Sequence, residues 1–303
     1  MAGTETRGVE AIEPVATASW VGWLPLAVLP LSAVAARSSL PAWGFMWLLA
    51  FSIYAALKWL TWWPARNLSR TPWRSIAYLL AWPGMDAECF LDARLRAAPP
   101  SARKWAWAIF ETALGAALLW MIARTIPEAA DLLRGWVGML GLVLLLHFGS
   151  FQLLSLLWQS AGVNARPIMS APLRATSLSE FWGKRWNLGF RQLAHDLIFQ
   201  PLHRALGANV TGFLVFVVSG VIHDAVISLP ASGGYGLPTM YFMIQGAGVM
   251  LERSSLGKEL GLRQSIRGWI FMAAVTAGPA FWLFHPPFIR HVILPFMQAI
   301  RAL

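Results

Sequence analysis

The sequence predicts an all-α integral membrane protein, a polytopic bundle of about seven or eight transmembrane helices with one amphipathic helix at the cytoplasmic interface. Composition supports this, because 57% of the 303 residues are hydrophobic and only 13% are charged, against about 25% charged residues in an ordinary soluble domain. The apolar residues also form separate stretches, each close to the ~20 residues that a helix needs to cross ~30 Å of hydrocarbon.

The apolar stretches follow one another along the chain. They lie at residues 20–36, 41–60, 105–123, 135–158, 210–229, 237–251 and 268–284, with shorter ones at 75–85 and 288–300. The first stretch lacks the small-residue cleavage pattern of a signal peptide, so we expect it to remain as an anchor. These stretches leave no room for a separate soluble module, and we expect residues 1–303 to form a single polytopic membrane domain.

Basic residues gather in alternate connections between the stretches. The three basic groups are Arg66, Arg70, Arg74, Arg94, Arg96, Arg103 and Lys104; Arg166, Arg174, Lys184, Arg185, Arg191 and Arg204; and Arg253, Lys258, Arg263 and Arg267. The intervening connections hold one Arg or no charge. This alternation follows the positive-inside rule, so we expect the basic loops to face the cytoplasm. The net charge of +10 therefore does not indicate nucleic-acid binding. Arginine far outnumbers lysine, which favours a bacterial inner membrane.

Few residues suit a metal site. Cys89 is the single cysteine of the sequence, which excludes a disulfide framework and a cysteine-rich metal site. Prenyltransferases and CDP-alcohol transferases need several acids on one helix, whereas Asp residues are scattered here. We therefore expect no metal.

His223 and Asp224 lie in the middle of the apolar stretch 210–229. A charged Asp near the centre of a membrane helix costs roughly 2.5–3.5 kcal/mol on insertion scales. Such residues face a bundle interior or a water-filled cavity, and by default they mark a functional site. The alternative is a hydrogen bond between helices that only stabilises the bundle.

A second polar pattern lies in a predicted cytoplasmic helix. Ser177 and Glu180 have capping-box spacing, which starts a helix, and we expect Pro201 to stop it. At 100° per residue, one face carries an apolar stripe of Trp182, Trp186, Phe190, Leu193 and Leu197, and another carries Asn187, Arg191 and His195. A plain interfacial anchor is the alternative. The mixture of amide, guanidinium and imidazole favours a site.

Together the two segments resemble the membrane-bound O-acyltransferase superfamily, and in particular its wax-synthase-like branch. Residues 181–187, Phe-Trp-Gly-Lys-Arg-Trp-Asn, are similar to the Phe-Trp-x-x-Arg-Trp-Asn pattern of that branch. Residues 219–224, Ser-Gly-Val-Ile-His-Asp, are similar to its Ser-Gly-x-x-His-Glu pattern, with Asp in place of the commoner Glu. The motif region spans about 160–229, and the chain is short for the superfamily.

The resemblance implies transfer of an acyl group from acyl-CoA to the hydroxyl of a hydrophobic alcohol, giving an ester as a wax-ester synthase does. It implies that His223 is the general base and Asn187 its polar partner. These residue types suit the reaction, since a histidine exchanges a proton near neutral pH and an amide donates a hydrogen bond to an oxyanion. We expect both side chains to converge on one cavity.

Further residues are candidates for substrate binding, namely Arg185, Arg191, Trp186 and His195. Guanidinium groups bind phosphate in a bidentate manner, so Arg166, Arg174 and Lys184 join the arginines above as candidates for coenzyme A. A basic residue beside a membrane helix is more often a topology signal. We expect acyl-CoA as a co-substrate rather than a bound cofactor. The other expected partners are a hydrophobic alcohol and the lipid bilayer, with no nucleic acid.

Two other functions fit a polytopic chain less well. A non-catalytic transporter or lipid-binding membrane protein is one, but transporters often show paired halves, and the sequence shows no internal repeat. A rhomboid-like serine protease is the other. It requires Gly-x-Ser-Gly, and Val217 stands where the first glycine would be.

Overall fold

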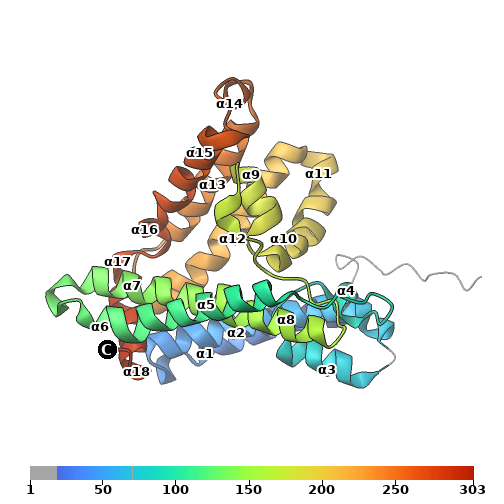
Figure 1. Cartoon of the computed structure of the whole chain (residues 1–303), viewed down its shortest axis with the longest axis horizontal. Helices are drawn as coiled ribbons and strands as arrows, with labels where there is room; N and C mark the ends of the chain where they lie inside the picture. The colour runs from blue at the N-terminus through green and yellow to red at the C-terminus, as the bar shows by residue number, and fades with distance from the viewer. Residues whose placement is uncertain (1–18, 70) are drawn as a thin grey trace, which may run out of the picture.

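The computed structural model describes residues 19–69 and 71–303, and in these ranges the chain is helical with no strand. The predicted all-α fold is confirmed. Residues 1–18 and Arg70 of the first basic group lie outside the described residues. Figure 1 shows two groups of helices: a layer formed mainly by α1, α2, α5, α7 and α8, and a second group, α9–α11 and α13–α16, that rises steeply from it. Helix α12 lies where the two groups meet.

The first group accounts for the N-terminal half. Its helices are α1 (Trp20–Ala35), α2 (Ala42–Ala65), α3 (Pro72–Ala81), α4 (Ala87–Leu91), α5 (Ala102–Ala117), α6 (Ala123–Thr125), α7 (Asp131–Val143) and α8 (Phe151–Ser160). The π-helical segments η4 (Leu118–Ile122) and η6 (Leu144–Ser150) join α5 to α6 and α7 to α8. Short 3-10 turns are η2 (Arg37–Ser39), η3 (Arg66–Leu68) and η5 (Glu128–Ala130).

The second half carries the two motif segments. Its elements are η7 (Pro172–Arg174), α9 (Leu178–Glu180), η8 (Phe181–Arg185), α10 (Leu188–Ala194), η9 (His195–Phe199), α11 (Gln200–Leu206), α12 (Ala208–Ala231), α13 (Leu237–Arg253), α14 (Ser255–Glu259), α15 (Ser265–Ala277), α16 (Ala280–Leu283), α17 (Pro286–Phe288), η10 (Ile289–Ile293) and α18 (Leu294–Ala299).

Among the described residues, five helical stretches are long and apolar enough to cross a membrane. They are Ala42–Leu68, Ala102–Thr125, Glu128–Ser160, Ala208–Ala231 and Ser265–Leu283. The predicted count of seven or eight crossings is not confirmed. Helix α1 has 16 residues, which is about 24 Å at 1.5 Å per residue and less than the hydrocarbon thickness. Helix α13 has 17 residues, and the last apolar stretch is divided between α17, η10 and α18.

The predicted amphipathic helix from Ser177 to Pro201 is wrong as a single helix. It begins as expected, with Ser177 Oγ accepting from Glu180 N at 3.0 Å. It then breaks, because Trp186 is extended and Asn187 adopts a left-handed conformation with φ 41°. Pro201 does not stop the second part, since it lies at the start of α11 just after a π-helical segment, and the helix continues to Gly207.

The break also divides the predicted apolar stripe. Trp182 and Trp186 pack beside Phe181 and Met272. The side chains of Phe190, Leu193 and Leu197 pack instead with Leu57, Leu60 and Met85, on and beside α2. The stripe therefore faces two different sets of neighbours, and its second half attaches α10 to α2.

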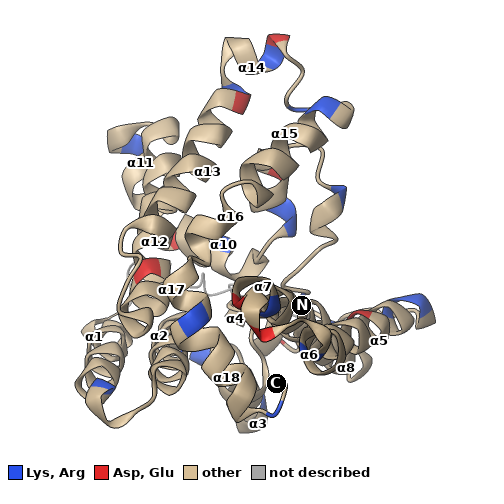
Figure 2. Cartoon of the chain, turned by 90° about the vertical axis from the view of Figure 1, so that its left-hand side faces the viewer, with Lys and Arg blue, Asp and Glu red and all other residues tan. Residues whose placement is uncertain are grey.

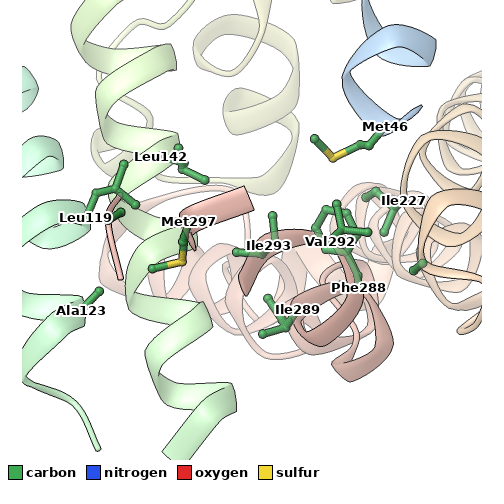
Figure 3. Close-up of a cluster of buried hydrophobic side chains, with 12 residues drawn as sticks. Met46, Leu119, Ala123, Leu142, Ile227, Phe288, Ile289, Val292, Ile293 and Met297 are labelled. Atoms are coloured by element: carbon green, nitrogen blue, oxygen red, sulfur yellow. The ribbon is translucent and has the colours of Figure 1, made fainter. Parts of the chain in front are cut away.

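The largest buried cluster lies around the C-terminal segment (Figure 3). Its side chains come from α2, η4, α6, α7, α12 and the last three helical elements, and they include Met46, Leu142, Ile227, Phe288 and Met297. Side chains at Gly135 and Gly138 of α7 would collide with Ile289 and Met297. These glycines let the C-terminal segment approach α7 closely, and the contact joins the end of the chain to its core.

Helices α12 and α13 form an antiparallel pair. A Cβ at Gly220 would lie 2.8 Å from Thr239 Cα, and one at Gly246 would lie 2.8 Å from the ring of Phe213. The connection 232–236 therefore lies at one end of the pair, with Gly207 and α14 at the other. Figure 2 shows few charged residues along the long helices and a group of them around α14.

This arrangement makes the topology testable. We expect residues 159–205 and 253–267 to face the cytoplasm and 230–236 to face the opposite side, because the basic loops lie at one end of the pair. A cysteine at Lys258 should resist an impermeant maleimide added to intact cells, and one at Ser232 should react.

The protein with Cys89 alone is the control, because burial raises the pKa of that thiol to about 12 and leaves it unreactive at neutral pH. Labelling of Lys258→Cys by the reagent added outside would contradict this orientation and indicate the opposite one.

Candidate active site

A cavity of about 270 Å³ lies between α12, α13, α10 and the segment η8. Asn187 and His223 both line it, although they are 36 positions apart in the sequence. Trp186, Arg191 and His195 line it as well, so three of the four residues expected to bind substrate lie here, and the fourth, Arg185, is absent from the lining. The two motif segments therefore meet at one place, which we call the site cavity.

The ring of His223 has one orientation imposed by its own helix. Its Nδ1 lies 2.7 Å from the backbone oxygen of Ser219, one turn earlier. A carbonyl oxygen only accepts, so Nδ1 carries a hydrogen and Nε2 is the nitrogen with a free lone pair. The ring of Phe242 packs against the imidazole with 4.4 Å between centroids. Ser219 thus orients the imidazole through its carbonyl group, and it is also among the residues that line the cavity.

Asn187 is held by the start of α10. Its Oδ1 accepts from Phe190 N at 3.3 Å, as an N-cap does. Because Oδ1 is used by the cap, the Nδ2 hydrogens are available to donate elsewhere. The left-handed backbone at φ 41° is one that Asn tolerates better than most residues. The preference of Asn for both the N-cap and this conformation was the sequence signal for the break.

Aromatic side chains form the walls beside these two residues. Trp182 Nε1 donates to Gln245 Oε1 at 3.3 Å, and Gln245 Nε2 donates to Val275 O at 2.7 Å. This chain of hydrogen bonds joins η8, α13 and α15. The ring of Trp186 stacks on Phe181 with 5.4 Å between centroids. The indole rings are therefore fixed by partners outside the cavity.

The end of the site cavity near the start of α12 is polar. Asn209 and Arg253 line it there, Arg191 and His195 line the cavity one and two turns after Asn187, and Arg253 Nε donates to Ser179 Oγ at 3.2 Å. The cavity follows α12 from Asn209 to His223, fourteen residues or about 21 Å at 1.5 Å per residue. Arg253 was not among the predicted site residues, because only the antiparallel pairing of α12 and α13 brings it beside Asn209.

The other basic candidates lie elsewhere. Arg185 forms an ion pair with Glu180, with Nη2 and Oε1 2.6 Å apart, and donates to the backbone oxygen of Ser170. The pKa of Glu180 is lowered first by the hydrogen bond from Thr176 N and then by Arg185. Arg166 lies 3.4 Å from Asp86 at a separate cavity. Arg174 and Lys184 do not line the site cavity either.

Asp224 turns away from the cavity. Its Oδ2 accepts from Gly236 N and from Thr239 Oγ1, both at 2.8 Å. Both donors belong to the start of α13, so the carboxylate binds the N-terminal end of that helix, where the helix dipole favours negative charge. The acid beside the histidine therefore holds α13 in place, and with it Phe242 against the imidazole.

Comparison with known proteins supports the resemblance read from the motifs. The model of the membrane bound O-acyl transferase family matches residues 165–244, which include both motif segments and most of the lining of the site cavity. The match covers about a quarter of the chain. It confirms the resemblance of this region to the membrane-bound O-acyltransferases.

Curated relatives come from the wax-synthase-like branch. A probable long-chain-alcohol O-fatty-acyltransferase of Arabidopsis thaliana is 29% identical over 143 residues, which cover 43% of this chain and 42% of the relative. The long-chain-alcohol O-fatty-acyltransferase of Simmondsia chinensis is 30% identical over 43% of this chain and 40% of the relative. An acyl-CoA–sterol O-acyltransferase of Arabidopsis thaliana is 30% identical over 42% and 40%. The matched part spans about two fifths of the length of these relatives.

The role of Asp224 gives a prediction about stability. Asp224→Ala should lower the free energy of unfolding by about 2–3 kcal/mol, since it removes hydrogen bonds to a charged group. Asp224→Asn keeps an accepting oxygen and should cost less. Thermal unfolding in detergent measures both, with Glu259→Gln as the control at an exposed carboxylate. Equal stability of Asp224→Ala and the unchanged protein would contradict this role.

Proposed function

We propose that this protein is a membrane O-acyltransferase that moves an acyl group from acyl-CoA to the hydroxyl of a hydrophobic alcohol. The observation that carries the proposal is the meeting of His223 and Asn187 in one cavity that is also lined by aromatic residues and by Arg191 and Arg253. The relatives named as long-chain-alcohol acyltransferases support the same reaction. We take the whole chain to act as one membrane domain.

The residues suit each step of the transfer. Nε2 of His223 takes the proton of the alcohol as its oxygen attacks the thioester carbonyl. The new C–O bond produces a tetrahedral oxyanion, and the Asn187 amide donates a hydrogen bond to it. The intermediate then releases the thiolate of coenzyme A, which receives the proton from the imidazolium. Direct transfer of this kind forms no acyl-enzyme, so Ser219 has no nucleophilic role.

The shape of the site cavity suits a long thioester. Arg191 and Arg253 would bind the phosphates of coenzyme A, since guanidinium groups pair with phosphate oxygens. The passage of about 21 Å along α12 would hold the slender arm that carries the sulfur to His223. The alcohol would come from the bilayer. A bacterial inner membrane as the location rests on the excess of arginine, whereas the curated relatives are plant proteins.

Substitution of the two central residues tests the reaction. With labelled palmitoyl-CoA and a panel of alcohols, esters identified by mass spectrometry should appear for the unchanged protein. His223→Ala should lower the rate by about 10²–10⁴-fold, as for loss of a general base. Asn187→Ala should lower it by about 10²–10³-fold, as for loss of one oxyanion donor. Glycine tolerates the left-handed backbone of this position, so Asn187→Gly removes the amide and keeps the turn. An equal loss of rate in Asn187→Gly would therefore be due to the missing amide.

Ser219→Ala is the matched control on the same face of α12. It should change the rate by less than about tenfold, since the backbone oxygen that orients His223 is retained. Full activity of a folded His223→Ala protein would overturn the mechanism. Loss of all activity in Ser219→Ala would indicate a serine nucleophile instead.

Gly212 tests the passage separately from the chemistry. A Cβ at Gly212 would contact nothing within 4 Å, yet this residue lines the site cavity inside a helix. Gly212→Leu should therefore stabilise the helix by up to about 1 kcal/mol and fill the passage. We expect activity with palmitoyl-CoA to fall at least tenfold, while the short donor palmitoyl-S-N-acetylcysteamine, which need not span the passage, is still used.

The control is Val221→Leu, at an exposed position of α12 outside the cavity, which should leave both donors unaffected. An equal loss with both donors in Gly212→Leu would contradict a passage for the coenzyme.

A further inference from the structure

Lys58 is a buried lysine in the C-terminal part of the long apolar helix α2. It is 1% exposed, and no ion pair of Lys58 with a carboxylate occurs in the described part of the chain. Its Nζ donates to the backbone oxygen of Gly84 at 2.7 Å and lies 3.0 Å from the ring centroid of Tyr78. A buried ionisable side chain in an apolar helix of this kind is expensive and is kept where it has a function.

Lys58 belongs to a polar face of α2. Tyr54, Lys58 and Thr61 lie at i, i+4 and i+7, and so share one side of the helix. Tyr54 Oη donates to Trp82 O at 3.0 Å, and Thr61 Oγ1 lies 2.7 Å from Tyr78 Oη. This face therefore forms hydrogen bonds with α3 and with the connection 82–86. Because that connection is not helical, its carbonyl groups need hydrogen-bond donors from elsewhere.

The same connection supports the first turn of α10. A Cβ at Gly189 would lie 3.1 Å from Met85 N and 3.7 Å from Gly84 Cα, so the two backbones touch. The side chain of Met85 packs with Leu193 of α10 and with Leu57 of α2. The connection 84–85 thus lies between α2 and the turn that begins at Asn187.

Asn187 depends on this turn because its side chain caps it. The hydrogen bond from Phe190 N to Asn187 Oδ1 sets the plane of the amide, and Gly189 lies between these two residues. A displacement of Gly84 and Met85 would therefore move the amide that faces the site cavity. A misplacement of about 1 Å is enough to cost a reaction about 10²-fold in rate.

We propose that Lys58 is a positioning residue for Asn187. It acts through the Gly84 carbonyl and the contact of Met85 with Gly189, and it is not among the residues that line the site cavity. Lysine suits this role because its stem crosses the apolar packing of α2 while its ammonium group donates at the far end. The inference rests on the proposed function for its effect on rate, and on geometry alone for its effect on α10.

The central test is a double-mutant cycle with Lys58→Met, which keeps the length of the side chain and removes the donor. We expect Lys58→Met to lower kcat by about 10- to 10²-fold with an unchanged KM for palmitoyl-CoA. In the Asn187→Gly background the same change should cost less than about threefold, because the amide that Lys58 positions is already absent. Effects of the two substitutions that simply multiply would overturn the proposal.

Tyr54→Phe is the matched control. It removes another hydrogen bond from the same face of α2 to the same connection, at Trp82 rather than Gly84. Its effect on thermal unfolding should be similar to that of Lys58→Met, with kcat within about threefold of the unchanged protein. A loss of kcat equal to that of Lys58→Met would mean that general destabilisation explains both.

Hydrogen exchange supplies a readout that needs no activity. Lys58→Met should speed the exchange of the backbone amides of residues 85–86 and 189–192, and Tyr54→Phe should not. If the unchanged protein transfers no acyl group, the proposed function fails while this measurement still decides the link between Lys58 and α10.

If Lys58→Met does not fold, Gly189→Ala tests the link from its other end and should reproduce the loss of kcat. Unchanged exchange and unchanged kcat would refute it.

Discussion

The close approach of α12 and α13 at Gly220 is the contact on which the rest of the site depends. A side chain at Gly220 would meet the backbone of Thr239, so the two helices can lie this close only with glycine there. Within one turn, Phe242 reaches the ring of His223 and Asp224 binds the start of α13. The same pairing brings Arg253 to the opposite end of the cavity. The interface between α12 and α13 therefore both packs the two helices together and forms part of the candidate site.

The adjacent polar residues His223 and Asp224 of α12 face different surroundings. Neighbours on a helix point about 100° apart, so His223 faces the site cavity while Asp224 faces the connection to α13. The cost of placing an acid at this depth is offset by two hydrogen bonds and by the positive end of a helix dipole. The imidazole of His223 is thus held by its carbonyl partner and by packing, and within residues 19–69 and 71–303 its ring has no carboxylate partner.

The second motif works through a break in a helix. Had the segment from Ser177 to Pro201 been one helix, Asn187 would have offered its amide along the helix side, with neither oxygen nor nitrogen held. The left-handed turn instead makes Asn187 the cap of α10, so that its oxygen is used and its nitrogen hydrogens are left to donate. The backbone of that turn packs against Gly84 and Met85. Lys58 of α2 in turn donates a hydrogen bond to the Gly84 carbonyl.

The sequence by itself determined the all-α membrane class and the positions of most helices, because hydropathy and helical periodicity are local properties. The choice of His223 and Asn187 came from the resemblance of two short motifs to a known family. Tertiary structure decided the rest. The break at Asn187 overrode a regular 3.6-residue pattern, since the two halves of its apolar stripe pack on different neighbours. Arg253 lines the site cavity, whereas Arg185 pairs with Glu180 outside it. The pairing of helices that are distant in the sequence determines which of several similar basic residues reaches the cavity.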